Sequence, residues 1–255
     1  MTASLFAAAL GVELQKSLRA RVPVVAAILL VGGVVAICLS VTVAVAGGDP
    51  AIVAKLGPVV GEGGWNGYLN AALQVTAAAA AGACGILVSW SVGREFAEGT
   101  VSGLFALPVS RTVIAAAKLI AFAAWSTTVA LALISALFIA GVLAGFGPLP
   151  RNGGEIAVRL LVLVLATAGV TLAAAWVATL TRGLLGGIAA TVVLLASAQV
   201  VVFSGGGAWY PPSAPALWAL DPTPTTAVPL AGALAVGGVF AVLTLLSWRR
   251  MELDR

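Results

Sequence analysis

The sequence predicts an all-α integral membrane protein with six transmembrane helices, and composition and segment length carry this prediction. Of the 255 residues, 61% are hydrophobic and 9% are charged, whereas a soluble domain is about half apolar and about one quarter charged. A span takes about 20 residues, so the chain divides into about six spans with short loops and no sizeable soluble domain. We therefore expect residues 1–255 to form a single transmembrane domain.

Residues 2–21 predict an N-terminal elbow helix that lies in the membrane interface. Leu5, Leu10, Leu14 and Leu18 recur mostly every four residues, and charged residues such as Glu13 occupy the other sides of the turn. This amphipathic pattern is typical of an interfacial helix, with a plain solvated tail as the alternative. Charges precede the first apolar run and no small-residue cleavage site follows it, so we expect no cleavable signal peptide.

Apolar segments follow, separated by residues that end helices. Glycine and proline in residues 47–50 end the first span, and residues 147–154 form a turn after the third. The link at residues 181–183 is so short that the fourth and fifth spans must be antiparallel neighbours. Trp65 and Tyr68 precede and open the second span, and such aromatic residues are typical headgroup-level anchors. The predicted spans are residues 22–46, 68–92, 119–146, 156–180, 184–203 and 230–248.

Residues 204–229 are the longest irregular stretch. Their glycines and prolines exclude one continuous helix, yet Trp209, Tyr210 and Trp218 are too apolar for a free loop. A short helix over residues 213–220 that re-enters the membrane from the outer side satisfies both observations.

The basic residues predict the orientation of the chain. If the N-terminus is cytoplasmic, only Lys55, Arg151 and Arg159 lie outside. The basic residues inside are then Lys16, Arg19, Arg21, Arg94, Arg111, Lys118, Arg182, Arg249, Arg250 and Arg255. This positive-inside bias explains the net charge of +4 without a nucleic-acid partner. We expect a multi-pass protein of the bacterial inner (plasma) membrane with both termini cytoplasmic; the Ala, Gly, Val and Arg bias suggests the bacterial source.

The sequence lacks residues that most catalytic and ion-coupled mechanisms need. It has no histidine, and Cys38 and Cys84 lie in apolar runs, where small buried thiols are expected and not a disulfide or metal site. No span carries an ionisable side chain at its middle, which disfavours a proton-driven carrier, although sodium held by backbone carbonyls stays open. No glycine-rich P-loop is present, and Glu95 and Glu98 lack an enclosed pocket. We expect no enzyme activity and no cofactor or metal in this chain.

Residues 93–118 form a charged insert between the second and third spans. At helical periodicity one side of the insert is apolar and the other is polar. The apolar side holds Phe96, Thr100, Val101, Leu104 and Leu107, and the polar side holds Arg94, Glu95, Glu98 and Ser102. Pro108 ends this short helix and Ser110 is placed to cap the next. Such a helix suits docking into a groove of a soluble partner, with a loop that merely reverses the chain as the alternative.

These residues resemble the cytoplasmic signature of type-2 ABC transporter permeases (the ABC-2 type membrane subunit). The matching elements are Glu95-Phe96, Glu98-Gly99-Thr100, Leu104, Pro108-Val109-Ser110-Arg111 and Lys118. The resemblance implies a cytoplasmic coupling helix in the insert and a role in ATPase coupling for Glu95, Phe96, Glu98, Gly99, Thr100, Pro108, Ser110, Arg111 and Lys118. It also suggests that Gly99 bends the backbone and that Arg111 pairs with Glu95, Glu98 or an acid of the partner.

The resemblance further implies a permease subunit energised by two separate ABC ATP-binding subunits, which would hold ATP and Mg²⁺. A second permease, identical or homologous, would complete a dimer in contact with membrane lipid. The uncharged spans favour export of a hydrophobic or amphipathic compound such as an antibiotic peptide, a drug or a lipid. Candidates for the cargo pathway, each with helix packing as the alternative role, are Gln74, Thr76, Trp125, Thr128, Trp176 and Gln199.

Two other functions stay open on the sequence. The first is a membrane protein of the same fold that does not transport, and that sequesters or senses a lipid or peptide at its outer segment around residues 209–218. The second is a self-sufficient secondary carrier, which the missing ionisable residues disfavour.

Overall fold

The protein is built from long α-helices. The computed structural model describes the chain except residues 1, 49, 52, 56–62, 107 and 253–255, so Asp49, Leu107 and Arg255 lie outside the described residues. Across the described part there are helices and no strands. Six helices are long and apolar enough to cross a membrane: α2 (Arg21–Ala46), α4 (Gly64–Ala97), α6 (Arg111–Leu143), α7 (Gly153–Leu180), α8 (Leu184–Phe203) and α10 (Pro224–Arg250). The predicted all-α class with six candidate spans is confirmed.

Two of these helices extend into the charged insert. α4 continues to Ala97, past the predicted end of the second span, so the first residues of the insert are its last turn. α6 begins at Arg111 and not at residue 119, because the side chain of Ser110 accepts a hydrogen bond from the backbone N–H of Val113 at 3.3 Å. This is the helix cap predicted for Ser110. The irregular part of the insert is therefore shorter than the sequence indicated.

The last long helix also begins earlier than predicted. α10 starts at Pro224, where the side chains of Thr223 and Thr226 form a reciprocal capping box. Proline suits the first turn of a helix because the N–H it lacks has no partner there. Pro229 lies inside the helix without ending it. The two prolines made this segment look irregular in the sequence, whereas the cap makes it helical.

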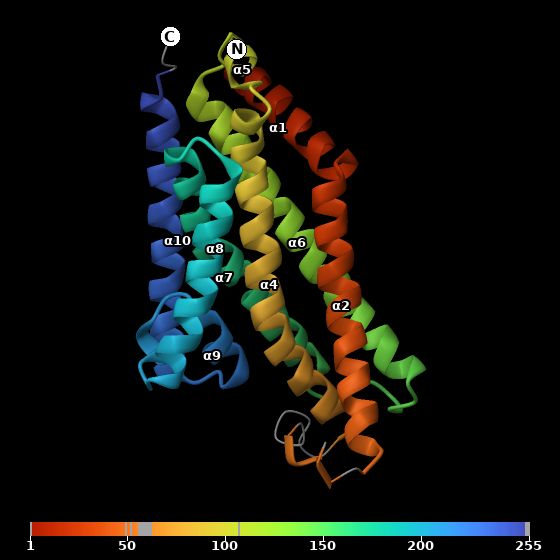
Figure 1. Ribbon diagram of the computed structural model, residues 1–255. Coiled ribbons are helices and arrows are strands. Elements are labelled where there is room, and N and C mark those ends of the chain that lie inside the picture. Colours follow the sequence, from red (N-terminus) through yellow and green to blue (C-terminus); the bar gives the residue numbers. More distant parts are fainter. Residues whose placement is uncertain (1, 49, 52, 56–62, 107, 253–255) are drawn as a thin grey trace.

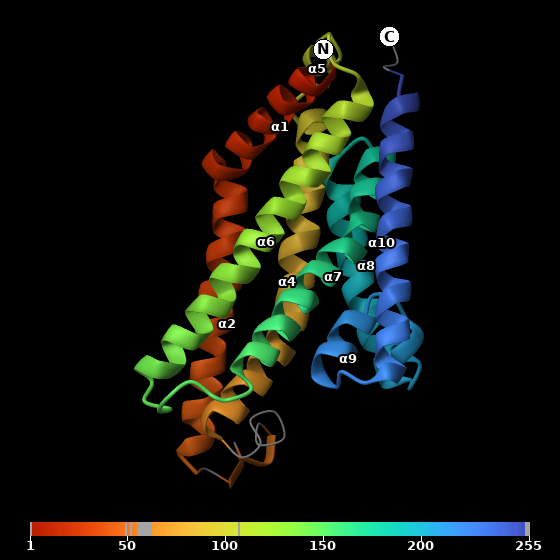
Figure 2. The ribbon, with the colours of Figure 1, turned by 180° about the vertical axis from the view of Figure 1, so that it is seen from behind.

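Among the described residues, shorter helices are α1 (Thr2–Arg19), α5 (Val101–Phe105), the 3₁₀ turn η1 (Gly207–Trp209) and α9 (Ala214–Leu220). Figures 1 and 2 place both termini and α5 at one end of the bundle and α9 toward the other. The helices predicted near the N-terminus and at residues 213–220 are therefore present. Their positions relative to a membrane stay predictions.

The centre of the bundle is formed by α4 and α7. In their most apolar stretches 50% and 61% of the residues are buried, against 11% in α8 and 17% in α2. Leu69 and Leu73 of α4 and Leu160 and Leu163 of α7 are among the largest fully buried side chains. The outer helices α2, α8 and α10 thus present most of their apolar surface outward.

Small residues bring α4 and α8 into close contact over residues 85–93 of α4 and 184–191 of α8. A Cβ atom added at Gly85 would meet the side chain of Thr191 at 2.3 Å, and one added at Gly93 would meet the backbone of Leu184 at 2.7 Å. Between these points, Gly187 of α8 lies against Ser89 of α4. Side chains at i, i+4 and i+8 share one helix face. We call this contact the glycine seam.

Four aromatic side chains pack together at the end opposite α5. Trp65 and Tyr68 are 8% and 0% exposed, and their rings contact Phe146 with centroids 5.8 and 5.3 Å away. The ring of Phe138 also contacts Trp65, and the Tyr68 hydroxyl donates to the carbonyl of Leu137 at 3.3 Å. The prediction that Trp65 and Tyr68 anchor the protein at the lipid headgroups is therefore wrong, because both side chains are enclosed by the protein.

Candidate functional site

Two carboxylates and two ammonium groups meet where α1, α4 and α6 come together. Lys16 of α1 places its Nζ 2.8 Å from Oε1 of Glu13 and 2.8 Å from Oε1 of Glu95 in the last turn of α4. Lys118 of α6 places its Nζ 3.1 Å from Oε2 of Glu13 and 3.1 Å from Oε1 of Glu95. We call these four residues the charge cluster. It ties three helices together through alternating positive and negative groups.

Most of the charge cluster is buried. Lys118 is 1% exposed, Glu95 4% and Glu13 6%. Buried charges are tolerated when they are paired and hydrogen-bonded, and the two lysines balance the two glutamates here. Burial acts to lower the pKa of Lys16, but hydrogen bonds and charges from Glu13 and Glu95 raise this pKa above its ordinary value. Lys16 therefore carries a full positive charge at neutral pH.

The position of Glu95 corrects the sequence analysis. Helical periodicity placed Glu95 on an exposed polar side of the insert, whereas the side chain points into the buried charge cluster. The periodicity was counted for one helix through residues 96–107. The structure has two helices there, because α4 ends at Ala97 and α5 begins at Val101.

Arg111 also has other partners than those expected. Its guanidinium donates to the backbone carbonyl of Met251 and lies over the ring of Phe105, 4.3 Å from the centroid. Glu98 instead pairs with Arg94, one helical turn earlier, at 3.3 Å. Within the described residues Arg111 pairs with neither Glu95 nor Glu98, and its pairing with an acid of the partner stays a prediction. Arg111 fastens the start of α6 to the chain that follows α10.

The turn between α4 and α5 is set by Gly99 and Thr100. Gly99 has φ +69°, a left-handed conformation that favours glycine, so the predicted bend at Gly99 is confirmed. The Thr100 hydroxyl donates to Oε2 of Glu95 at 2.6 Å. α5 is a helix of five residues only, and Leu107, the last residue of the predicted apolar side, lies outside the described residues. The turn is thus linked directly to the charge cluster.

The aromatic residues of the insert contact the protein itself. The rings of Phe96 and Phe105 pack edge-on against Trp248 of α10, with centroids 6.0 and 6.3 Å apart. Trp248 is fully buried and donates from Nε1 to the hydroxyl of Thr179 at 3.2 Å. Phe96 and Phe105 therefore use part of their surface within the protein, and both stay half-buried.

The nine residues matched to the coupling signature fall into two groups. The buried or half-buried group is Glu95, Phe96, Arg111 and Lys118, and the exposed group is Glu98, Gly99, Thr100, Pro108 and Ser110. The exposed group lies around the short helix α5, at the end of the bundle where both termini lie (Figure 1). It forms the part of the signature that another protein can touch, while the other group holds that part in place. We call the exposed group the α5 surface.

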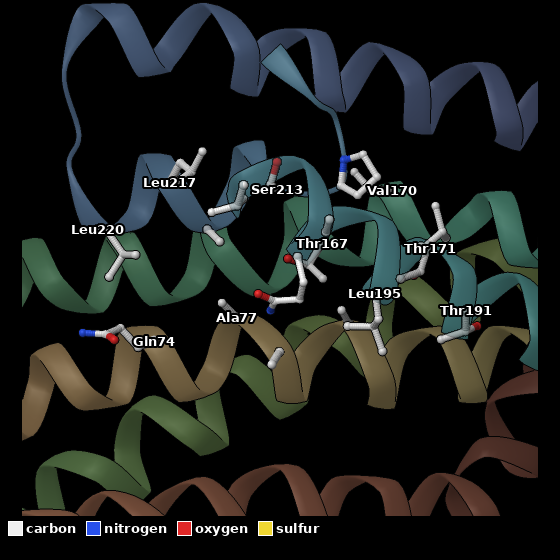
Figure 3. A pocket seen from close by; sticks show the side chains of 18 residues that line it. Gln74, Ala77, Thr167, Val170, Thr171, Thr191, Leu195, Ser213, Leu217 and Leu220 are labelled. Atoms are coloured by element: carbon white, nitrogen blue, oxygen red, sulfur yellow. The ribbon is translucent and has the colours of Figure 1, made fainter. Parts of the chain in front are cut away.

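A cavity of about 330 Å³ lies between α4, α7, α8 and α9. Gln74 and Gln199, two of the cargo candidates, are among its lining residues, together with Thr167, Thr171 and Ser213. Figure 3 shows the side chains that line the cavity, contributed by all four of these helices. Its remaining lining is mostly alanine, leucine and valine.

The other cargo candidates lie away from this cavity. Trp125 donates to the carbonyl of Pro23 and Trp176 to the hydroxyl of Ser247, each at 3.2 Å. Thr128 donates to the carbonyl of Ala124 within α6. The hydroxyl of Thr76 is buried without a hydrogen-bond partner in the described part of the chain. The structure thus brings only Gln74 and Gln199 of this set to one cavity.

Sequence reasoning missed several residues of both sites. Glu13 and Lys16 were seen only as the polar side of an interfacial helix, although their spacing of three residues already allows an ion pair on one helix face. Thr167 and Thr171 are spaced by one turn on α7, which was a usable signal for a polar stripe. Among the described residues, no three histidine, cysteine, aspartate or glutamate side chains come together as metal ligands.

A family model described as ABC-2 family transporter protein matches residues 9–197. This range covers α2, α4, α5, α6 and α7, most of α1, and most of α8. No curated protein matches the chain.

Proposed function

Because this chain belongs to the ABC-2 family of transporter proteins, we propose that it is the membrane-spanning permease subunit of an ATP-driven exporter. Its six apolar helices make it a multi-pass membrane protein. Two separate ATP-binding subunits supply the energy and hold ATP and Mg²⁺. A second permease, identical or homologous, forms the translocation pathway together with this chain.

The cargo in this proposal is a hydrophobic or amphipathic compound. Long helices with uncharged middles support such a cargo over a small ion, because ion pathways in membranes use ionisable side chains. The protein resides in the bacterial plasma membrane with both termini cytoplasmic. The excess of basic residues at the end that carries the termini and α5 supports this orientation.

The single observation that carries the proposal is the link between the α5 surface and the charge cluster. Thr100 belongs to the α5 surface and donates to Glu95, while Glu95 binds lysines of α1 and α6. A displacement of α5 by an ATP-binding subunit therefore reaches three helices through direct polar contacts. A loop that merely reversed the chain would not require a buried charge network behind it.

The test uses two glutamates in matched surroundings. Glu98 and Glu155 are both exposed, and each pairs with an arginine four residues away on its helix, Arg94 and Arg159 respectively. Glu98 belongs to the α5 surface, whereas Glu155 begins α7 at the other end of the bundle. Glu98→Arg and Glu155→Arg therefore make the same charge change at the two ends.

We expect Glu98→Arg to lower ATP-driven transport in vesicles by about tenfold or more. The reason is that two charges of the same sign placed against each other across an interface cost several kcal/mol. Glu155→Arg should leave transport near the wild-type level. The first measurement is copurification of an ATP-binding subunit with the wild-type chain. Equal transport by the two variants, or a chain that transports without any ATP-binding subunit, contradicts the proposal.

One observation favours a second function. Trp209 in η1 is 74% exposed, and an exposed tryptophan at a membrane end is suited to contact a lipid or a peptide. A protein of this fold that senses or sequesters such a molecule would lose its activity in Trp209→Ala and keep it in Glu98→Arg. The exporter proposal predicts the reverse, namely activity lost in Glu98→Arg and kept in Trp209→Ala.

A further inference from the structure

The cavity begins where the glycine seam ends. Thr191 of α8 meets Gly85 of α4 at the last contact of the seam, and it also lines the cavity. Beyond this point residues of both α4 and α8 line the cavity, and Leu217 and Leu220 of α9 line it as well (Figure 3). The seam therefore fixes one end of the helix pair, and the cavity lies at the other end.

The polar atoms of the cavity are uncharged and partly free. None of the side chains that line it is acidic or basic. Thr167 is 6% exposed, and its hydroxyl has no hydrogen-bond partner within the described part of the chain. The amides of Gln74 and Gln199 likewise have none among the described residues. The Thr167 hydroxyl and the two amides are among the groups that line the cavity, so each can donate a hydrogen bond to a bound group or accept one from it.

Three other hydroxyls of the lining are already used as donors. Thr171 donates to the carbonyl of Ala168, Thr191 to that of Gly187, and Ser213 to that of Gly207. Their oxygens remain able to accept a hydrogen bond from a ligand. The cavity thus offers both donors and acceptors but no charged side chain that could pair with a charged ligand.

The volume sets the size of the ligand. Pockets for drug-sized molecules measure about 300–1,000 Å³, and this cavity of about 330 Å³ is at the lower end of that range. It accepts one small molecule or one acyl segment and excludes a whole antibiotic peptide. Val170, Leu194 and Leu195 give it an apolar wall beside the polar groups.

We propose that this cavity is a binding site for one small, uncharged amphiphile with an amide or hydroxyl group on an apolar body. All of the residues that line it belong to one copy of the chain. If the protein is the proposed exporter, this site restricts its cargo to such amphiphiles. Only the transport of the bound molecule rests on the proposed function. Binding itself requires neither an ATP-binding subunit nor a second permease.

The test is photolabelling of the purified full chain in lipid nanodiscs without partner subunits. The probe is a medium-chain N-alkyl acetamide that carries a diazirine in its alkyl chain. Matched probes carry a carboxylate, or no polar group, on the same chain. Labelled peptides are located by mass spectrometry, and an excess of the unlabelled acetamide tests whether labelling saturates.

The variants are chosen to fill the cavity or to remove one polar atom. Ala78 lines the cavity on α4, so Ala78→Trp places an indole inside it. Ala132 is an exposed alanine of α6 away from the cavity, so Ala132→Trp is the matched control. Thr167→Val removes the free hydroxyl while keeping the side-chain shape. A thermal unfolding curve for each variant establishes that it folds.

We expect saturable labelling by the acetamide on α4, α7, α8 or α9, and its loss in Ala78→Trp but not in Ala132→Trp. Thr167→Val should weaken the binding of the acetamide probe by about fivefold, which corresponds to the net contribution of one hydrogen bond. The binding of the probe without a polar group should stay unchanged. Labelling that does not saturate, equal labelling by the carboxylate probe, or an unchanged acetamide affinity in Thr167→Val overturns the proposal. Copurification of the ATP-binding subunit is measured separately, so a failed exporter and an empty cavity give different results.

Discussion

Replacement of Lys118 by methionine tests the charge cluster most directly. Lys118 is 1% exposed and contacts Glu13 and Glu95 at 3.1 Å each. In Lys118→Met, Lys16 alone faces two buried carboxylates, and its own side chain is 25% exposed. Removal of one partner from a buried ion pair costs about 3–5 kcal/mol, because the remaining charge stays out of water. We expect Lys118→Met to lower the free energy of unfolding by about this amount.

The assay is thermal unfolding of the purified chain in one detergent. A loss of about 3–5 kcal/mol corresponds to a Tm lowered by about 6–20 °C at about 2–4 °C per kcal/mol for a protein near this size. Lys55→Met is the control, because Lys55 is an exposed residue and such changes stay within about 0.5 kcal/mol.

A second substitution separates charge from packing. Lys118→Met combined with Glu13→Gln leaves one lysine and one glutamate, Lys16 and Glu95, which still pair at 2.8 Å. The double variant should recover part of the lost stability, with a coupling energy of about 0.5–3 kcal/mol for residues in contact. A Tm of Lys118→Met equal to that of Lys55→Met, or no recovery in the double variant, would refute the reasoning.

Three further predictions concern single positions. Gly93→Ala should destabilise the protein by about 1–3 kcal/mol, because the new Cβ meets the backbone of Leu184. Gly82→Ala is the control on the same helix: its Cβ has open space, so this change should stabilise the protein by about 0.5–1 kcal/mol. Equal Tm values for the two variants would contradict the glycine seam. Thr76→Val removes a buried hydroxyl without a partner and should raise the free energy of unfolding by about 1 kcal/mol, as measured by thermal unfolding, with a decrease counting against it. Ser110→Ala removes the cap of α6 and should cost about 1 kcal/mol in the same assay, whereas Ser110→Asp should keep the stability.

The six long helices could be predicted from the sequence because length and apolar composition decide membrane spans without tertiary information. The predicted bounds of the fifth span, residues 184–203, are those of α8. Gly183 precedes its first residue and Ser204 follows its last, and both positions can be recognised in the sequence. The end of α4 at Ala97 was missed, because it depends on the turn at Gly99, whose φ is +69°. The cap at Ser110 was predicted, but the third span was placed from residue 119 because the apolar run begins only there.

The candidate sites were predicted in part. Polarity alone selected Gln74 and Gln199, and both line the cavity. Thr167 was missed although its one-turn spacing from Thr171 marks a polar stripe on α7, because the stripe alone does not show that α4, α8 and α9 enclose a cavity beside it. Glu95 was assigned to the wrong side for a similar reason, since its partners Lys16 and Lys118 lie 79 and 23 residues away along the chain.

The length of α4 has a mechanical consequence for the whole bundle. The helix runs unbroken from Gly64 to Ala97 and contains no proline. Glu95 in the charge cluster and Gln74 at the cavity stand on this one helix, about 31 Å apart at about 1.5 Å per residue. No proline interrupts the backbone hydrogen bonds between them, so a continuous helix connects the two sites. With the glycine seam as the fulcrum between them, a small swing of α4 at Glu95 changes the width of the space beside Gln74.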